Sequence, residues 1–431
     1  MLKHRLSLAV AMALGTTGVN AAHDAPVARM EVVNIIGTRD EARQLPGSAY
    51  VIDKEELEVF QYSDINNILT QAPGVYLQQE EGYGLRPNIG IRGSGTDRSG
   101  KITLMEDGVL IAPAPYSNPS AYYFPTAGRM SGVEVLKGPT LLQQGPYTVG
   151  GAVNLLSTPI PEEYSGNVLT EFGERGETRL LANYGGSGEQ YGWLLETHQH
   201  RGDGFKDIDR GGDAGFNKED YMGKVRWNTG ADASMYQSVD LKLQYSTEVS
   251  DMSYLGLTDA DFDDDPNRRY GLTEKDQMDN RHSGINLGYY IEFNDNVDMQ
   301  LTAYYNKFKR DWFKVDNIGG VKVGDAIDFA NGEDGPIAGF VANAVLHGQA
   351  DAAGIDIKHN NREYTSRGLQ GRVNWEFNTG DVAHAFSAGL RLHRDYMDRY
   401  QPVEVYDQEN GSLVYQTTEA PTGSNNREDR G

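Results

Sequence analysis

The sequence predicts a mostly β protein in which a small α+β domain precedes the strands of a transmembrane antiparallel β-barrel. Three observations support this prediction. Short β-type runs, closed by glycine and proline, fill residues 82–161. Longer segments after residue 161 alternate apolar and polar side chains. No later stretch approaches the roughly 20 apolar residues of a membrane-spanning helix, so a membrane-spanning region would have to be a barrel.

Composition excludes several classes of protein. The chain has 431 residues, no cysteine, 51 glycines and a formal net charge of −23. Without cysteine there is no disulfide framework, no thiol nucleophile and no zinc–cysteine site. No basic stripe is present to neutralise phosphates, so we expect no nucleic-acid partner. No nucleophile–base arrangement stands out, and we expect a protein that is not an enzyme.

Residues 1–21 have the pattern of a secretory signal peptide. Lys3, His4 and Arg5 supply the positive start, LSLAVAMAL supplies an apolar core, and Ala21 lies at a small-residue cleavage site. At nine residues this apolar core is too short to span a bilayer as a helix. The pattern predicts export.

Residues 22–45 are predicted to form a flexible arm. It contains a β-branched run that could add a strand to the sheet edge of a partner, with affinity from backbone hydrogen bonds. The same run could instead be the first strand of the next domain, and the residues alone leave both open. The run is Glu31, Val32, Val33, Asn34, Ile35 and Ile36.

Residues 46–160 are predicted to form the small domain. Asp53, with Glu56 three residues later, resembles a capping box that starts a helix. Ser63 or Asp64 starts a second short helix, which Pro73 and Gly74 end. The β-type runs that follow include IGIRG, KITLMEDGVLI, GVEVLKG and GAVNLLS.

Four strings in this domain carry a resemblance to a known family. GLRPNIGIRG, LMEDGVLIAPAPY, RMSGVEVLKGP and GPYTVGGAVNLLSTPIP occur in this order. They resemble the plug domain of TonB-dependent outer-membrane receptors, with most similarity to the ferric dicitrate receptor branch. The resemblance implies that the small domain plugs a barrel in the bacterial outer membrane. It also implies that residues 31–36 are the TonB box gripped by the TonB energy transducer.

Residues 161–431 are predicted to form the N-terminal part of the barrel. In VDLKLQY and INLGYYIEF, and again in GLQGRVNWEF and FSAGLRLHRDY, apolar residues share one face of a strand. Lengths of about ten residues favour a membrane barrel over a soluble β-sandwich, whose strands are usually shorter. About ten such segments are present, against roughly 22 in a plugged outer-membrane transporter. We therefore expect the N-terminal part of a longer receptor.

Three charged residues lie within strand-like runs of the small domain. Arg92, Glu134 and Lys137 fit an exposed alternating pattern. The family resemblance implies instead that such charges join the plug to the barrel wall through ion pairs, and we favour this interpretation.

Two long linkers, residues 250–280 and 311–361, are predicted extracellular loops, because such barrels have long loops on one side only. The first contains a cluster of five aspartates, at positions 259, 261, 263, 264 and 265, without the ordered spacing of a calcium loop. His198 and His200 could chelate a metal, but a polar pair in the barrel lumen explains them better. We expect no resident metal or cofactor.

Ferric citrate is polyanionic, so its receptor needs arginines and hydrogen-bond donors. An ordinary charged loop, in which arginines balance aspartates, explains the arginines equally well. In place of Asn118 and Ser120 the citrate receptors carry glutamine, which puts dicitrate itself in doubt. The ligand-binding candidates are Tyr116, Asn118, Ser120, Arg268, Arg269 and Arg281.

The resemblance implies energised uptake of a ferric chelate, either a siderophore or a compound like ferric citrate. The alternatives are a TonB-dependent transporter of a vitamin, another metal or an oligosaccharide, and a passive barrel or adhesin. A porin would lack the arm and the plug. The expected partners are the TonB transducer complex, the ferric chelate and outer-membrane lipid, and we expect a monomer.

Overall fold

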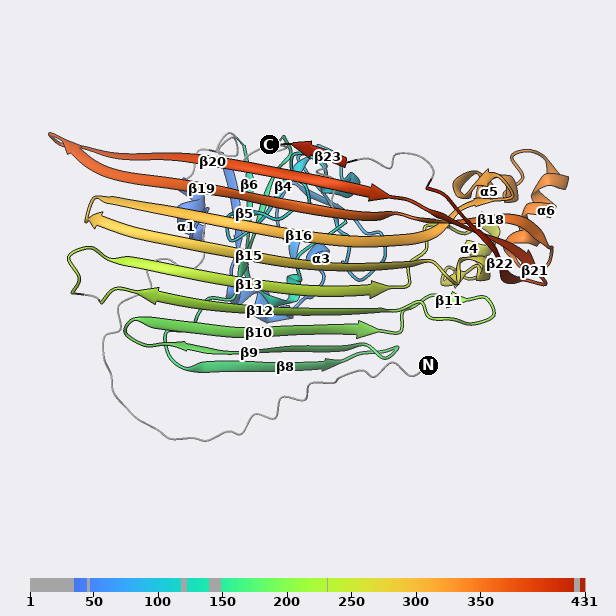
Figure 1. Cartoon of the computed structure of the whole chain (residues 1–431), viewed down its shortest axis with the longest axis horizontal. Helices are drawn as coiled ribbons and strands as arrows, with labels where there is room; N and C mark the ends of the chain where they lie inside the picture. The colour runs from blue at the N-terminus through green and yellow to red at the C-terminus, as the bar shows by residue number, and fades with distance from the viewer. Residues whose placement is uncertain are drawn as a thin grey trace.

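The computed structural model describes residues 35–44, 47–117, 122–138, 149–230, 232–421 and 427–430. A large sheet of long antiparallel strands forms one layer, and a small α+β domain lies against one face of it (Figure 1). The prediction of a mostly β chain with these two parts is confirmed. Within the described residues the sheet is open and does not close into a barrel.

The small domain is built on a five-stranded sheet with the strand order β1-β6-β7-β4-β5. β4 and β7 run parallel, and the other neighbours are antiparallel. A separate hairpin pairs β2 with β3. The elements are α1 (Arg39–Gln44), β1 (Ser48–Ile52), α2 (Lys54–Phe60), α3 (Ile65–Leu69), β2 (Val75–Gln78), β3 (Asn88–Ile91), β4 (Ile102–Glu106), β5 (Val109–Leu110), β6 (Met130–Lys137) and β7 (Gly151–Ser157).

Both predicted helix starts in this domain are confirmed. The side chain of Asp53 accepts a hydrogen bond from the Glu56 backbone N–H at 3.0 Å, and that of Asp64 accepts from Asn66 N–H at 2.7 Å. These bonds satisfy N–H groups that have no partner within the helix. The apolar face of α3 is buried against the core of the domain, as its helical spacing predicts.

The large sheet follows the path β22-β21-β18-β16-β15-β13-β12-β10-β9-β8, and β19 and β20 continue it from β16. Its long strands are β8 (Ser165–Phe172), β9 (Thr178–Ser187), β10 (Tyr191–Gly202), β12 (Phe216–Asn228), β13 (Gln237–Ser250), β15 (Gln277–Asn294), β16 (Val297–Ile318), β19 (Asn361–Thr379) and β20 (Val382–Tyr400). Its shorter strands are β17 (Val321–Lys322), β18 (Ala352–His359), β21 (Val403–Glu409), β22 (Ser412–Glu419) and β23 (Arg427–Arg430). β11 (Asp207–Ile208) and β14 (Arg268–Arg269) pair with each other in a separate two-stranded parallel sheet.

The two faces of the large sheet differ in polarity, as the alternation predicts. On β13, Leu243 is 47% exposed on the outer face, whereas Lys242 and Gln244 are buried on the face that carries the small domain. Ile285 on β15 is 48% exposed. An apolar outer face and a polar inner face are the pattern of a membrane barrel.

The ends of the sheet are unequal. Short turns join the strands at one end, and long loops with α4 (Asp259–Asp264), α5 (Val323–Ala330) and α6 (Pro336–Leu346) lie at the other (Figure 1). The predicted limits of the long linkers were wrong, because β15 and β16 extend into them and residues 323–346 are largely helical. None of the helices in the described part of the chain is long and apolar enough to span a membrane.

The small domain packs directly on the inner face of the large sheet. Its apolar core includes Phe308 from β16, Tyr364 from β19 and Met397 from β20, each at most 2% exposed. The two layers therefore share one apolar core. On each of these three strands, the next inward-facing side chain in the direction of the long loops lies outside this core.

Candidate functional site

Three arginines form a row across the inner face of the large sheet. Arg310 on β16 is directly opposite Arg362 on β19, which is directly opposite Arg399 on β20. Such pairs point to the same side, with Cβ atoms about 4.5–5.5 Å apart. We call Arg310, Arg362 and Arg399 the arginine row. It lies one inward position beyond the shared core, on the side of the long loops.

Like charges placed opposite each other on a sheet are destabilising. Arg310 is only 2% exposed, and no carboxylate among the described residues forms an ion pair with Arg310 or Arg362. Within the same residues, the Nε atoms of both arginines lack a hydrogen-bond partner, as does Nε1 of Trp312. Buried charges are normally paired, so these donors are arranged as an anion would require.

Aromatic rings hold the cations in place. The guanidinium groups of Arg98, from the small domain, and Arg310 lie 4.6 and 4.3 Å from the centre of the Tyr122 ring. Lys314 Nζ lies 3.3 Å from the centre of the Tyr254 ring. These cation–π contacts compensate the charges in part, and NH2 of Arg310 also donates to the Tyr364 hydroxyl at 3.4 Å. Tyr122 belongs to the small domain, so a ligand on the arginine row would contact both layers.

The segment of the small domain that carries these contacts is also tied to β20. The backbone N–H groups of Tyr116 and Ser117 donate to the carboxylate of Asp395 at 2.6 and 3.0 Å. Asp395 is fully buried and also lies 3.1 Å from Nε2 of His393. The Tyr116 ring packs on His393. Tyr116 therefore lies at the boundary between the small domain and the wall, and Met397 of the shared core separates its contacts on β20 from Arg399.

Buried ion pairs join the small domain to the wall. Arg129 Nε lies 2.9 Å from Asp220 on β12, and its NH2 lies 3.0 Å from Glu106 on β4. Lys242 on β13 reaches Glu106 at 2.6 Å and Asp107 at 2.5 Å. Burial alone would raise the pKa of Glu106, but Arg129 and Lys242 hold it below its ordinary value. These pairs fix the small domain against the sheet.

A second set of contacts joins the loop around residue 86 to the end of β13. Arg86 forms a buried ion pair with Glu248, and its NH2 donates to Ser250 Oγ at 2.7 Å. Beside this contact, a cleft of about 450 Å³ lies toward the long loops. Its lining mixes Glu80, Glu81 and Asp251 with cationic side chains, so it does not select a ligand of one charge.

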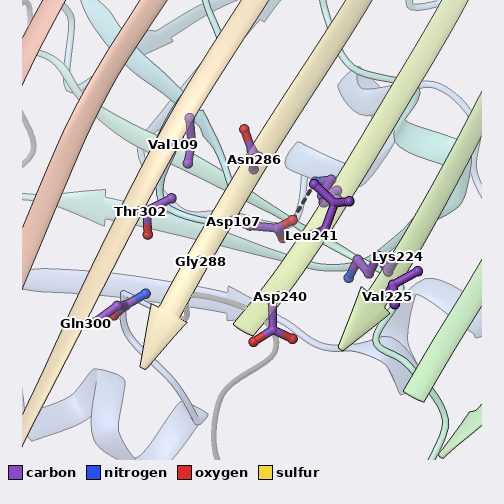
Figure 2. A pocket seen from close by; sticks show the side chains of 11 residues that line it. Asp107, Val109, Lys224, Val225, Asp240, Leu241, Asn286, Gly288, Gln300 and Thr302 are labelled. Atoms are coloured by element: carbon purple, nitrogen blue, oxygen red, sulfur yellow. Dashed lines mark hydrogen bonds and ion pairs between the residues drawn. The ribbon is translucent and has the colours of Figure 1, made fainter. Parts of the chain in front are cut away.

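A cleft of about 530 Å³ lies nearer the short turns, where the turn after β4 meets the wall. Figure 2 shows Asp107 reaching from the small domain toward the strands of the wall. Charged and amide side chains stand beside apolar ones in the lining of this cleft. The lining residues are Asp107, Val109, Lys224, Val225, Asp240, Leu241, Lys242, Asn286, Gly288, Gln300 and Thr302.

The structure does not bring the three predicted ligand arginines together. Arg268 binds Asp209 and Asp261 at 3.0 and 2.8 Å, which joins two loops. Arg269 is buried and donates to Thr273 Oγ1 and to loop carbonyls. Arg281 is exposed on β15, one residue from Asn280, whose side chain faces inward. Arg268 and Arg269 thus match the charged-loop alternative, and the arginine row replaces these three as the candidate.

The remaining predicted site residues divide into two groups. Asn118, Ser120 and residues 31–34 lie outside the described residues, whereas Ile35 and Ile36 are described. Arg92, Glu134 and Lys137 were predicted to contact the wall, but their contacts are within the small domain. Glu134 and Lys137 lie on β6, which pairs with β1 and β7 of the same domain, and Arg92 follows β3. Lys137 Nζ donates to the Pro73 carbonyl at 2.6 Å, Glu134 binds residues 35–37, and Arg92 is exposed.

The predicted polar pair His198 and His200 faces the inner side of β10. His200 Nε2 lies 2.9 Å from Glu177, while both ring nitrogens of His198 lack a partner among the described residues. In that part of the chain, no group of three or more histidine, aspartate and glutamate side chains is arranged to hold a metal ion.

Asp276, in the loop before β15, gives a prediction for pH dependence. Burial raises its pKa to about 7, although Arg269 opposes the shift. The folded loop then keeps a proton that the unfolded chain releases near pH 4, so loop stability should fall as pH rises from about 4 to 7. Hydrogen exchange of residues 253–276, corrected for intrinsic rates, should show more opening at pH 8 than at pH 5. Asp276→Asn should remove most of this difference; an unchanged difference would contradict the assignment.

Comparison with known proteins agrees with this architecture. Residues 41–152 match the TonB-dependent Receptor Plug Domain family. The vitamin B12 transporter BtuB of Vibrio vulnificus is 30% identical over 179 residues, which cover 41% of this chain and 28% of that protein. The iron-regulated outer membrane virulence protein of Vibrio cholerae is 28% identical over 32% of this chain and 21% of that protein. The predicted plug domain and the outer-membrane location are confirmed.

Solved structures share the fold. The unliganded ferric citrate transporter FecA aligns with a TM-score of 0.67 at 21% identity, covering 93% of this chain and 54% of that chain. The siderophore receptor PiuA from Acinetobacter baumannii aligns with a TM-score of 0.61 at 16% identity, covering 93% and 56%. The chain thus spans about half the length of these receptors.

Proposed function

The chain carries the plug domain of a TonB-dependent receptor on the inner face of a barrel-type sheet, and on this premise we propose that it serves the energised uptake of an anionic ferric chelate. The arginine row carries the proposal. Its members Arg310, which is buried, and Arg362 form no ion pair with a carboxylate among the described residues, and the row lies on the side of the long loops, where Arg310 contacts Tyr122 of the plug. Carboxylates and other oxyanions match guanidinium donors in charge and geometry.

In the proposed mechanism, the chelate binds between the arginine row and the plug residues Arg98 and Tyr122. The chelate binds two arrangements of the plug with different affinities. Ligand binding therefore shifts the population toward the arrangement that binds the chelate more tightly. The TonB transducer then adds a strand to residues 31–36 and pulls on the plug. The plug is held by the ion pairs of Arg129 and Arg86, so the pull has to break or rearrange them.

A second candidate ligand is a vitamin, because two of the similar curated proteins are vitamin B12 transporters. A large corrinoid does not present several carboxylates to one row of donors, and it would leave Arg310 and Arg362 unpaired. The arginine row therefore favours the anionic chelate. Binding of ferric citrate, a ferric hydroxamate and cyanocobalamin to the purified protein compares these classes directly.

Removal of residues 31–36 is the test of energised transport. We expect the deletion to abolish uptake of radiolabelled ferric chelate and growth on it as sole iron source, while binding at the cell surface is retained. Deletion of residues 24–29 is the matched control, because it shortens the arm equally and leaves residues 31–36 in place. Uptake that survives the first deletion would contradict the mechanism, and equal growth on every iron source would contradict an iron ligand.

A further inference from the structure

The outer face of the large sheet carries a group of basic side chains at the end that bears the long loops. Arg281 is directly opposite Lys309 across β15 and β16, and Arg367 is directly opposite Arg394 across β19 and β20. These side chains point away from the plug, because Arg310, next to Lys309, contacts the plug. We define the basic patch as the six cations in this area: Arg281, Lys307, Lys309, Arg367, Arg394 and Arg427.

The basic patch begins where the apolar band of the outer face ends. The outward side chains of β15 are apolar or aromatic from Ile285 to Phe293, and those of β20 are apolar from Phe386 to Leu392. At about 3.4 Å per residue and a tilt of about 45°, the stretch on β15 covers roughly 20 Å of a membrane band that is about 25 Å tall. The patch therefore lies at the level of the lipid head groups.

Basic residues occur at one border of this band and on one part of the sheet. The structure describes β15, β16, β19 and β20 in full, and none of the outward-facing residues at their short-turn ends is lysine or arginine. The outward residues of β9, β10, β12 and β13, also fully described, include no lysine or arginine in the rows of the patch. The patch is thus local, as a binding site for an anion would be.

The carboxylates within the patch do not neutralise it. Glu363 lies 2.7 Å from Lys307 and 3.7 Å from Lys309. Asp429 is shared in the same way by two arginines of the patch, at 2.7 and 4.0 Å. Together with Asp398, three carboxylates lie among six cations, and the patch keeps a net positive charge.

A hydroxyl group at the centre of the patch has no partner. Thr365 is directly opposite Lys307 on one side and Tyr396 on the other. It is 3% exposed, and its Oγ1 lacks a hydrogen-bond partner among the described residues. An unpaired buried hydroxyl costs free energy, which an oxyanion bound between these side chains would recover.

We propose that the basic patch binds the phosphorylated head group of lipopolysaccharide in the outer leaflet of the membrane. Neighbouring strands are about 4.8 Å apart, so the five strands from β15 to β23 spread the cations over roughly 19 Å. This width suits a disaccharide with two separated phosphates better than a phospholipid with one. Arginine binds phosphate oxygens through two N–H donors, and the adjacent apolar band accommodates the acyl chains.

The test measures lipid binding to the purified receptor in detergent by native mass spectrometry. Lipid A with two phosphates should bind more tightly than lipid A with one phosphate or phosphatidylglycerol. Arg367→Gln should weaken binding of the first lipid about fivefold, and added Lys307→Gln should bring the loss to tenfold or more, because each basic residue near an anionic lipid surface contributes to affinity. Arg201→Gln is the matched control: Arg201 is exposed on the outward face of β10, outside the patch, and its loss should not change binding.

Each other outcome would overturn part or all of the proposal. Unchanged binding in the double variant, or an equal loss in Arg201→Gln, would overturn the site. Equal affinity for phosphatidylglycerol, lost equally in the double variant, would overturn the assignment to a glycolipid. The double variant should keep its unfolding temperature in lipid-free detergent, because both side chains are exposed. It should also keep its affinity for a ferric chelate, since the patch and the arginine row lie on opposite faces, so the two proposals can fail separately.

Discussion

Replacing Arg310 and Arg362 together by alanine is expected to weaken binding of an anionic ferric chelate by about two to four orders of magnitude. Hydrogen bonds to charged groups contribute roughly 1.5–3 kcal/mol each, and the pair would lose at least two of them. The same double variant should unfold at a higher temperature than the unaltered protein, because it removes like charges that face each other across β16 and β19. Equilibrium binding of ferric citrate and thermal unfolding measure the two effects.

A double variant that binds the chelate more weakly but is more stable would show that the two arginines serve binding and not the fold. A residue kept for the fold would lower stability when removed, whereas a residue held unpaired for a ligand should raise it. Arg281→Ala is the matched control, because it removes the same charge from the outer side of neighbouring β15 and should change neither quantity. Unchanged affinity in the double variant, or a clear loss of stability, would contradict the assignment of the arginine row.

Much of the fold follows from local patterns. The capping aspartates Asp53 and Asp64 act on N–H groups two or three residues away, so spacing alone predicts both helix starts. The period of two in β13, β15, β19 and β20 likewise assigns an outer and an inner face to each strand. These features depend on neighbours in sequence, which is why the sequence carries them.

The arginine row could not be predicted in this way. Arg310 and Arg362 are brought together by the pairing of β16 with β19 across an intervening segment that contains α5, α6 and β18. Only the register of that pairing makes them opposite. The alternation of β19 does place Arg362 on the same, inward-facing side of the strand as Gln370. It does not show which strands are neighbours in the sheet.

The prediction for Glu134 failed for a related reason. Alternation within one strand cannot distinguish a side chain that faces the wall from one that faces another part of the same domain. The packing of the plug decides the matter: Glu134 is fully buried on β6 and accepts a hydrogen bond from Asn154 of the neighbouring β7. The backbone groups of residues 35–37, which bind Glu134, lie about 100 residues away in sequence and carry no side-chain signal.

Replacing Arg129 by methionine is expected to have the largest effect on the integrity of the plug. Arg129 is 2% exposed and lies between Glu106 of the plug and Asp220 of the wall. Removing one member of a buried ionic cluster leaves charges without a partner and costs about 3–5 kcal/mol. The variant should show protease cleavage within residues 46–160 at lower urea concentrations than the unaltered protein.

The charges, rather than the volume of the side chain, are expected to cause this effect. Adding Glu106→Gln and Asp220→Asn to Arg129→Met should restore much of the lost stability, because a buried ionic cluster and its neutral counterpart often differ little. Arg39→Met is the exposed control: Arg39 pairs with Asp53 and Glu56 at the surface, where such pairs contribute at most about 1 kcal/mol. If the triple variant is as unstable as Arg129→Met alone, packing around Arg129 holds the plug to the wall, and the ion pairs do not.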